Sequence, residues 1–165
     1  MVAQGVYFIQ PKLPSVIGVE GVGLIESLGA GVEHVKIGDR VCVPFGTYAW
    51  AELVKAPAKD LVVLSPKIDV QQASMLSANP VTAIFLLDEF KKLKKGNWIV
   101  LNAANSSVGS AIISVAKSRG LNVLAIVRRV AAVAIATSAG ADVVLVESST
   151  TLMKPKLLPK AQILP

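Results

Sequence analysis

The sequence has 165 residues, of which 53% are hydrophobic and 17% charged, with a formal net charge of +6. That apolar content is ample for a folded core and argues against disorder. Its apolar runs are interrupted well before the roughly 18 residues that a membrane span needs, and no secretory leader opens the chain. We expect a globular protein outside the membrane, in the cytoplasm. The mitochondrial matrix is the alternative if a targeting peptide has been lost.

The sequence has one cysteine, Cys42, and one histidine, His34, which leaves few ligands for a metal and no pair for a disulfide. A disulfide needs a pair of cysteines, and a structural zinc site needs about four Cys or His ligands. We therefore predict a zinc-independent protein without disulfides. Cys42 lies in a strand-like run and is interpreted as a small buried hydrophobe. His34 is interpreted as an exposed loop residue.

The first part of the chain, residues 13–63, alternates short valine- and isoleucine-rich runs with glycine turns. This pattern is typical of an antiparallel, barrel-like β domain. Residues 50–66 are expected to add two strands to it, and the aromatic side chains of Tyr48 and Trp50 to lie in the barrel core or a pocket wall.

Helical spacing follows, with Asp69 as a candidate N-cap and Pro80 at a break or in the first turn of a new helix. The lysine-rich residues 90–96 (FKKLKKG) are interpreted as the end of that helix, with Gly96 as its cap. No aromatic residues interleave with these lysines, unlike in single-strand binders. We therefore expect no nucleic-acid partner, despite the positive charge.

Beyond Gly96 the sequence alternates strand and helix patterns. Strands are predicted at 98–101, 122–127 and 142–146, and helices at 108–119 and 129–139. Such alternation predicts a parallel, doubly wound sheet, of which a full copy has about six strands. We therefore expect an incomplete two-domain protein, with a β domain at 1–78 and the first half of an α/β domain at 79–165. The second predicted helix lacks a charged face. Either it packs against a further surface, or some residues written in the sequence are smaller than the side chains of the real protein.

The turn after the first of these strands reads NAANSSVG. A dinucleotide-binding unit usually carries G-x-G-x-x-G there, and the three positions are Ala104, Ser106 and Gly109. Gly109 keeps the close helix–strand contact, while Asn105 tolerates left-handed geometry. Ser106 and Ser107 add hydroxyl donors at a helix N-terminus, which favours anions. Two interpretations are open: a pyrophosphate site, or an ordinary turn with a serine cap.

The second strand of this part ends in Arg128 and Arg129. An NAD-specific unit has an acidic residue there, which holds the ribose 2′-hydroxyl. Guanidinium groups suit a phosphate dianion, whereas positive charge at the start of a helix opposes its dipole. We therefore predict NADPH rather than NADH as the cofactor, with Val108 and the three residues before it at the pyrophosphate.

Three stretches of the sequence resemble the medium-chain dehydrogenase/reductase superfamily: IGVEGVGLIESLGAGVEHVKIGDRV, GTYAWAELV and LKKGNWIVLNAANSSVG. The resemblance extends from about Gly5 to Val146. It implies a GroES-like β-barrel domain joined to a Rossmann doubly wound parallel sheet, both incomplete in this chain. It also implies an oxidoreductase that acts on a small molecule, as a homodimer in its full-length form.

Two zinc-free branches of the superfamily compete. The turn NAANSSVG resembles the Asn-Ser loop of 2-enoyl thioester reductases more closely than the AAAGGVG-like loop of quinone oxidoreductases. The stretch SANPVTA is similar to the VNPxTAY stretch of enoyl reductases, which implies that Asn79 and Thr82 face the cofactor. Ile84 stands where that branch has a tyrosine, which is a departure from the pattern.

The segment QGVY is similar to the one that carries the catalytic tyrosine of the enoyl reductases, which implies that role for Tyr7. Hydride addition to an α,β-unsaturated thioester pushes negative charge onto the thioester oxygen. A phenol aimed there would stabilise that charge, and a proton must later reach the α-carbon. Without the resemblance, Tyr7 is interpreted as a packed or frayed N-terminal aromatic. Glu20 is expected to join a structural ion pair behind the site.

Three functions are therefore open. The first is NADPH-dependent reduction of a 2-enoyl thioester, as in fatty-acid synthesis. The second is a quinone oxidoreductase-type reduction of quinones or small enones. The third is a non-catalytic module that binds NADPH and turns nothing over.

Overall fold

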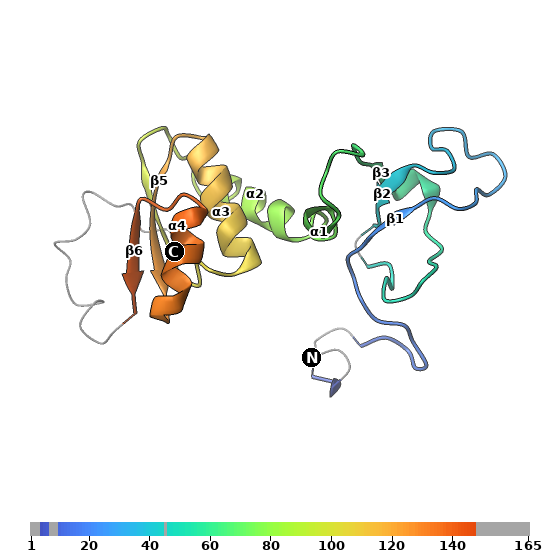
Figure 1. Cartoon of the computed structure of the whole chain (residues 1–165), viewed down its shortest axis with the longest axis horizontal. Coiled ribbons are helices and arrows are strands. Elements are labelled where there is room, and N and C mark those ends of the chain that lie inside the picture. Colours follow the sequence, from blue (N-terminus) through green and yellow to red (C-terminus); the bar gives the residue numbers. More distant parts are fainter. Residues whose placement is uncertain (1–3, 7–9, 45, 148–165) are drawn as a thin grey trace. The chain divides into compact units, whose positions relative to one another are not determined.

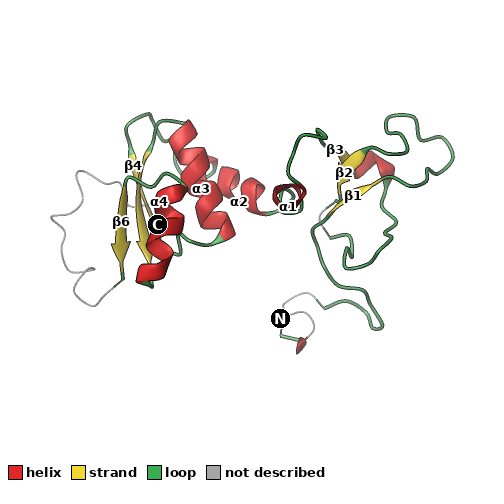
Figure 2. Ribbon diagram, in the orientation of Figure 1, coloured by secondary structure: helices red, strands yellow, loops and turns green. Residues whose placement is uncertain are grey.

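The computed structural model describes residues 4–6, 10–44 and 46–147. The chain divides into two compact units, Met1–Ala78 and Asn79–Pro165. Each unit has its own three-stranded sheet (Figures 1 and 2). The first sheet is antiparallel and the second parallel, which confirms the predicted fold class.

The antiparallel sheet of the first unit has the strand order β1-β2-β3. Its strands are β1 (Val22–Leu24), β2 (Arg40–Cys42) and β3 (Val62–Val63). A small apolar core of Ile25, Val35 and Val41 packs beneath them. Because the strands are only two or three residues long, loop contacts hold much of this unit together.

Residues 50–66 contain one described strand, β3, rather than the two that the sequence predicted. A short 3₁₀ turn, η2 (Ala58–Asp60), takes up part of this stretch. It follows Pro57, whose ring fixes φ and which has no N–H to donate to a sheet. The second predicted strand is therefore wrong.

The aromatic side chains of this unit lie on its surface. Trp50 is 72% exposed and Tyr48 is 49% exposed, so neither lies in a barrel core. The alternative, that they line a pocket wall, stays a prediction. The Trp50 indole lies against the backbone of Gly18, where a Cβ would come within 2.1 Å of the ring atom Cδ1. The Trp50 ring therefore packs against Gly18, and most of the side chain is exposed to solvent.

Two helices follow the β sheet in sequence. Helix α1 (Val70–Ala73) begins at the predicted cap, since the Asp69 carboxylate accepts a hydrogen bond from the Gln72 amide at 3.0 Å. Helix α2 (Asn79–Asp88) carries Pro80 in its first turn, as predicted. Proline is tolerated there because that amide has no intrahelical acceptor in any case.

Helix α2 ends at Asp88, and the lysine-rich residues 90–96 after it form a loop. The interpretation of this stretch as a helix end is therefore wrong. The amide of Gly96 donates to the carbonyl of Gly120 at 2.8 Å, which ties the loop to the chain before the second strand of the parallel sheet. Gly96 has a φ of +85°, so it works as a turn residue rather than a helix cap.

The parallel sheet of the second unit has the order β4-β5-β6. Its strands are β4 (Trp98–Leu101), β5 (Asn122–Val127) and β6 (Val143–Val146). Helix α3 (Ser107–Ser118) joins β4 to β5, and η3 (Val130–Ala132) with α4 (Val133–Ser138) joins β5 to β6. The predicted strand–helix alternation is thus confirmed, with the second helix split in two.

Helices α3 and α4 pack together over one face of this sheet, and α2 packs against α3 (Figure 2). On α3 the buried residues Gly109, Ile112, Ile113 and Ala116 recur at helical spacing and form a single face. Val123, Ala125 and Val127 of β5 join them in one core. This core fixes the position of the turn between β4 and α3.

The segment from Val130 to Ser138 has no charged side chain, as the sequence indicated. Val130 is 76% exposed and Ile135 49% exposed, while Ala132 and Ala136 are buried. No helix in the described ranges is long and apolar enough to cross a membrane. The exposed apolar side chains therefore belong to short surface helices.

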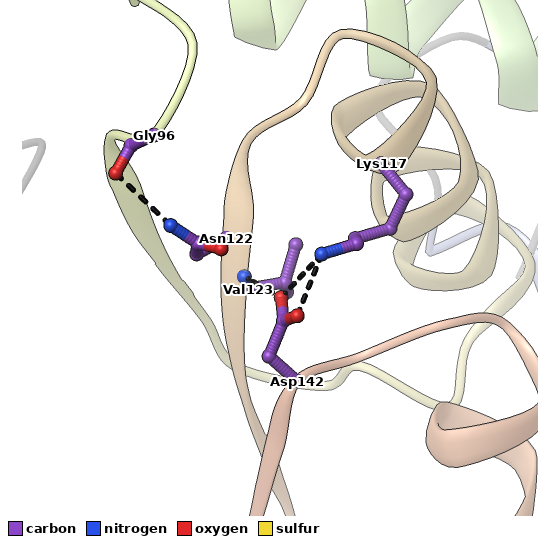
Figure 3. A network of polar contacts seen from close by, with 5 residues as sticks. All are labelled: Gly96, Lys117, Asn122, Val123 and Asp142. Carbon is purple, nitrogen blue, oxygen red and sulfur yellow. Dashed lines mark hydrogen bonds and ion pairs between the residues drawn. The ribbon is translucent and has the colours of Figure 1, made fainter.

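A polar network closes the amino ends of the three parallel strands (Figure 3). Just before β6, the Asp142 carboxylate accepts hydrogen bonds from Lys117 at 2.6 and 2.7 Å and from the Val123 amide at 2.7 Å. Beside it, the Asn122 side-chain amide donates to the Gly96 carbonyl at 3.0 Å. The network links α3 to two strands at the edge opposite their carboxyl ends.

The pKa of Asp142 is lowered from its ordinary value of 3.8. Partial burial alone would raise it, but the hydrogen bonds from Lys117 and the Val123 amide together outweigh burial. Ionised Asp142 therefore stabilises the folded state above its ordinary pKa. This contribution is lost as the pH falls through the lowered value.

Asp142→Asn is therefore expected to lower the free energy of unfolding at neutral pH, because an amide does not pair with the Lys117 ammonium. The difference from wild type should narrow as the pH falls below the ordinary carboxyl range. Denaturant titrations at neutral and acid pH measure this difference. A difference that stays constant across that range would contradict the assigned role of the carboxylate.

Candidate functional site

The turn between β4 and α3 contains one residue in the left-handed region. Ala103 has a φ of +46° and is the one described non-glycine residue with a positive φ. Asn105, which would tolerate that geometry, does not adopt it. The next residue, Ala104, is fully buried, and its amide donates to the Ile126 carbonyl at 3.3 Å. This bond pins the turn to β5, and the strain falls on the residue just before it.

Ala103→Gly is expected to raise the free energy of unfolding by about 0.5–1 kcal/mol. Glycine reaches a positive φ without the Cβ clash, and its larger entropy in the unfolded chain offsets part of that gain. Ala104→Gly is the matched control, since Ala104 is buried and has no positive φ. It should lower stability. Denaturant titration compares the two variants, and equal shifts in one direction would contradict the assignment of strain to Ala103.

Gly109 is the one glycine of the usual fingerprint that the chain retains, and its surroundings explain why. A Cβ there would lie 2.7 Å from the Ala103 carbonyl oxygen and 2.8 Å from that of Ala104. Both neighbours are backbone atoms of the turn, which cannot rotate away as a side chain could. The absence of a side chain at Gly109 lets α3 begin directly against the turn.

Ser106 is the N-cap of α3, with its Oγ accepting a hydrogen bond from the Gly109 amide at 3.0 Å. The interpretation of this turn as one with a serine cap is therefore correct. Accepting this bond uses an oxygen lone pair and leaves the hydroxyl proton for another acceptor. The cap is thus compatible with an anion bound at the N-terminus of the helix.

The first two amides of α3 belong to Ser107 and Val108, and neither has an acceptor among the described residues. Unsatisfied amides at a helix N-terminus are the donors that bind phosphate in nucleotide sites. Ser107 and Ser106 are exposed, and Asn105 is half-buried beside them. The turn therefore offers two backbone donors and two hydroxyl groups to one anion.

Arg128 and Arg129 directly follow β5, and both are exposed. Neither guanidinium forms a hydrogen bond or ion pair with another described residue. The bond from Ala104 to Ile126 brings the turn to the end of β5, so the arginines lie at the same edge of the sheet as the turn. Two unpaired cations beside an anion-binding turn suit a ligand with more than one phosphate group.

The same edge carries an acidic residue that the sequence interpretation missed. The amide of Glu147, which follows β6, donates to the carbonyl of Val127 at 2.8 Å. Glu147 is exposed and forms no ion pair with either arginine. Its position could have been found from the sequence, because parallel strands bring their carboxyl ends to one edge.

Asn79 and Thr82 lie in the first turn of α2, the helix that packs against α3. Asn79 is half-buried and Thr82 is exposed, and neither side chain is hydrogen-bonded within the described part of the chain. They thus belong to the same compact unit as the turn and the arginines. Their role toward a cofactor stays a prediction.

Tyr7, the predicted catalytic residue, lies outside the described residues. Its role also stays a prediction. Among the described residues, no group of three or more His, Cys, Asp and Glu side chains is placed to hold a metal ion. The exposed His34 ring is hydrogen-bonded through Nε2 to the Ala58 carbonyl oxygen at 2.8 Å.

Glu20 forms no ion pair with any of the residues that the structure describes, in contrast to the expectation from the sequence. Its Oε1 accepts hydrogen bonds from the Ala78 amide at 3.0 Å and from the Ser77 hydroxyl at 3.4 Å. The buried thiol of Cys42 is nearby, and burial raises its pKa. The Ser77 hydrogen bond acts in the opposite direction, and the Glu20 charge raises the pKa further. Cys42 is thus a protonated, buried side chain, as its sequence context indicated.

Comparisons with known proteins agree with this architecture. Residues 1–66 match the family described as the alcohol dehydrogenase GroES-like domain. Curated relatives include mitochondrial enoyl-[acyl-carrier-protein] reductases from Caenorhabditis elegans and Bos taurus. The first is 37% identical over 76% of this chain and 37% of its own length, and the second is 39% identical over 76% and 34%. The chain thus spans about a third of the length of these relatives.

Solved structures give the same picture. A quinone oxidoreductase from Pseudomonas syringae has 33% sequence identity and a TM-score of 0.76, covering 88% of this chain and 45% of its own. Escherichia coli quinone oxidoreductase complexed with NADPH has 26% identity and a TM-score of 0.79, covering 91% and 47%. The chain is thus similar, in sequence and in fold, to oxidoreductases that join a GroES-like domain to a Rossmann-type parallel sheet, as in the medium-chain dehydrogenase/reductase superfamily.

Proposed function

We propose that the protein is an NADPH-dependent reductase of 2-enoyl thioesters. The observation that carries the proposal is the turn between β4 and α3, where the free amides of Ser107 and Val108 lie at the same sheet edge as Arg128 and Arg129. The names of the enoyl-[acyl-carrier-protein] reductase relatives support the substrate class. The Asn-Ser character of the turn points to the same branch of the superfamily.

The residues present fit NADPH in charge and in shape. The amides and hydroxyls of the turn are donors for the pyrophosphate, because Gly109 lets the helix begin without a side chain in the way. The guanidinium groups of Arg128 and Arg129 are donors for the 2′-phosphate. In the proposed arrangement, Asn79 and Thr82 face the cofactor from α2. When bound, NADPH supplies the hydride for the β-carbon of the substrate.

The remaining task of the protein is to stabilise the charge that develops on the thioester oxygen. In our proposal the Tyr7 hydroxyl donates a hydrogen bond to that oxygen. A proton must then reach the α-carbon, and the phenol is in a position to relay it if it already contacts the oxygen. Catalysis here requires no metal, which agrees with the single Cys and single His of the chain.

A second function, reduction of quinones or small enones, is favoured by the solved structures named quinone oxidoreductase. The exposed oxygen of a quinone can take its proton from water, so this reaction would not need Tyr7. A binding module without turnover is the third alternative. It would keep the turn and the arginines but show no reaction.

Parallel assays of protein from the complete coding sequence separate these functions. We expect NADPH oxidation with a crotonyl-type thioester to be faster, at equal substrate concentration, than with a quinone. The reverse order would favour the quinone function. NADPH binding without oxidation of the cofactor in either assay would favour the binding module.

We further propose that the protein acts in mitochondria as a homodimer. The relatives' names include the word mitochondrial, which supports mitochondria over the cytoplasm. The dimer is implied by the family resemblance. Cell fractionation tests the compartment, and sedimentation of the purified protein tests the dimer.

A further inference from the structure

Glu147 is an exposed residue at the carboxyl edge of the parallel sheet, directly after β6. Its backbone continues the pairing of β5 with β6. Val127 lies opposite Val146, and the Glu147 amide donates to the Val127 carbonyl oxygen at 2.8 Å. Arg128 follows Val127, so Arg128 and Glu147 leave neighbouring strands at the same level of the sheet. Because neighbouring strands lie about 4.8 Å apart, both side chains can reach one bound group.

The Glu147 carboxylate has no partner within the described part of the chain. It forms no ion pair with Arg128, although their backbones are adjacent, and no hydrogen bond with another described side chain or backbone group. At the other end of β6, by contrast, Asp142 is held by Lys117 and the Val123 amide. The described fold thus gives Glu147 no structural task, and its charge acts on a group that binds at this edge.

The charge of Glu147 has different consequences for the two nicotinamide nucleotides. NADPH carries a phosphate dianion on the ribose where NADH carries a hydroxyl. A carboxylate repels the dianion, whereas it accepts a hydrogen bond from a ribose hydroxyl in NAD-specific units, where the acid follows the second strand. Here arginines follow that strand, and the acid follows the next one. Glu147 therefore opposes the arginines when the nucleotide is NADPH, but not when it is NADH.

We propose that Glu147 is a specificity-determining residue of the nucleotide site, which limits the preference for NADPH over NADH. Arg128 and Arg129 give the site its preference for NADPH, and the Glu147 carboxylate reduces the size of that preference. The inference rests on the proposed function for the place of the cofactor at this edge. It concerns the binding of the nucleotide and not the reduction of a thioester.

The test compares the nucleotide affinities of wild type and Glu147→Gln in protein from the complete coding sequence. Glutamine keeps the length and shape of the side chain and removes its charge. NADPH should bind about three- to tenfold more tightly to the variant, and NADH within about twofold of wild type. Fluorescence titration measures both dissociation constants. Because Glu147 is exposed, the melting temperature should stay close to that of wild type.

Two further variants show whether the charge acts at this position. Glu147→Asp keeps the charge, so its NADPH affinity should lie closer to wild type than to Glu147→Gln. Glu89→Gln removes an equal charge from an exposed site just after α2, at the opposite end of that helix from Asn79 and Thr82. It should leave NADPH affinity within about twofold of wild type. The gain in Glu147→Gln should also shrink as ionic strength rises, because salt screens exposed charges.

Unchanged or weaker NADPH binding by Glu147→Gln would overturn the inference. Weaker binding would mean that the carboxylate orients the arginines instead of opposing the phosphate. Equal gains in Glu147→Gln and Glu89→Gln would overturn it as well, because the effect would then be one of net charge.

These outcomes are distinct from a failure of the proposed function. If NADPH binds but no thioester is reduced, the proposed function fails and the titrations still decide the role of Glu147. If the wild type binds neither nucleotide, both are overturned. If the wild type reduces the thioester with NADPH and Glu147→Gln binds both nucleotides as wild type does, only the inference fails.

Discussion

Tyr7→Phe is expected to lower turnover of a crotonyl-type thioester by about 10²–10³, the range for losing one well-placed oxyanion donor. The change removes only the hydroxyl, so NADPH affinity and melting temperature should stay close to those of wild type. Reduction of a quinone should also be unchanged, because that oxygen takes its proton from water. Steady-state rates on both substrates, with wild type and variant, measure the effect.

Tyr48→Phe provides the matched control, since Tyr7 and Tyr48 are the two tyrosines of the chain. Tyr48 is half exposed in the first unit, and no step of the proposed reaction uses it. It should turn over the thioester at the wild-type rate. Equal thioester activity of Tyr7→Phe and wild type would remove Tyr7 from the mechanism and leave the quinone function ahead.

The combined substitution Arg128→Ala and Arg129→Ala is expected to weaken NADPH binding by about 10- to 100-fold, as charge-assisted hydrogen bonds to the 2′-phosphate are lost. NADH has no such phosphate, so its affinity should change little. The preference of the wild type for NADPH should therefore largely disappear. Titrations with both nucleotides measure the ratio of the two affinities.

A control variant that loses two positive charges elsewhere separates a specific contact between the arginines and NADPH from a general electrostatic attraction. Lys91→Ala with Lys92→Ala removes two positive charges from the exposed loop after α2. Because these lysines belong neither to the turn nor to the end of β5, and exposed charges are screened by salt, NADPH affinity should stay within about twofold of wild type. Equal losses in the two double variants would contradict a specific role for the arginines.

Strand and helix positions in the second unit could be predicted because its hydrophobic pattern is strong. The strands beginning at Trp98 and Asn122 start and end where the sequence indicated, since each is an apolar run closed by a polar turn. The first unit was predicted less well. Its strands are short, and a β-rich composition does not reveal that Trp50 stays exposed over Gly18.

At the candidate site, the chemistry of the turn could be predicted but its geometry only in part. The sequence indicated only that Asn105 tolerates a left-handed conformation, whereas the left-handed residue of the turn is Ala103, next to the hydrogen bond between the Ala104 amide and the Ile126 carbonyl. The partner of Glu20 was also hidden, because a backbone amide 58 residues away leaves no trace in composition or charge. Contacts of this kind depend on tertiary packing, not on local pattern.

Product analysis with protein from the complete coding sequence tests the proposed activity most directly. NADPH and a 2-enoyl thioester are incubated together, and oxidised cofactor and saturated thioester are quantified in the same sample. We predict that the two products form in equal amounts, and that NADH in place of NADPH gives a much slower reaction. Bound NADPH that stays reduced in the presence of the thioester, with no saturated product, would contradict the proposed function.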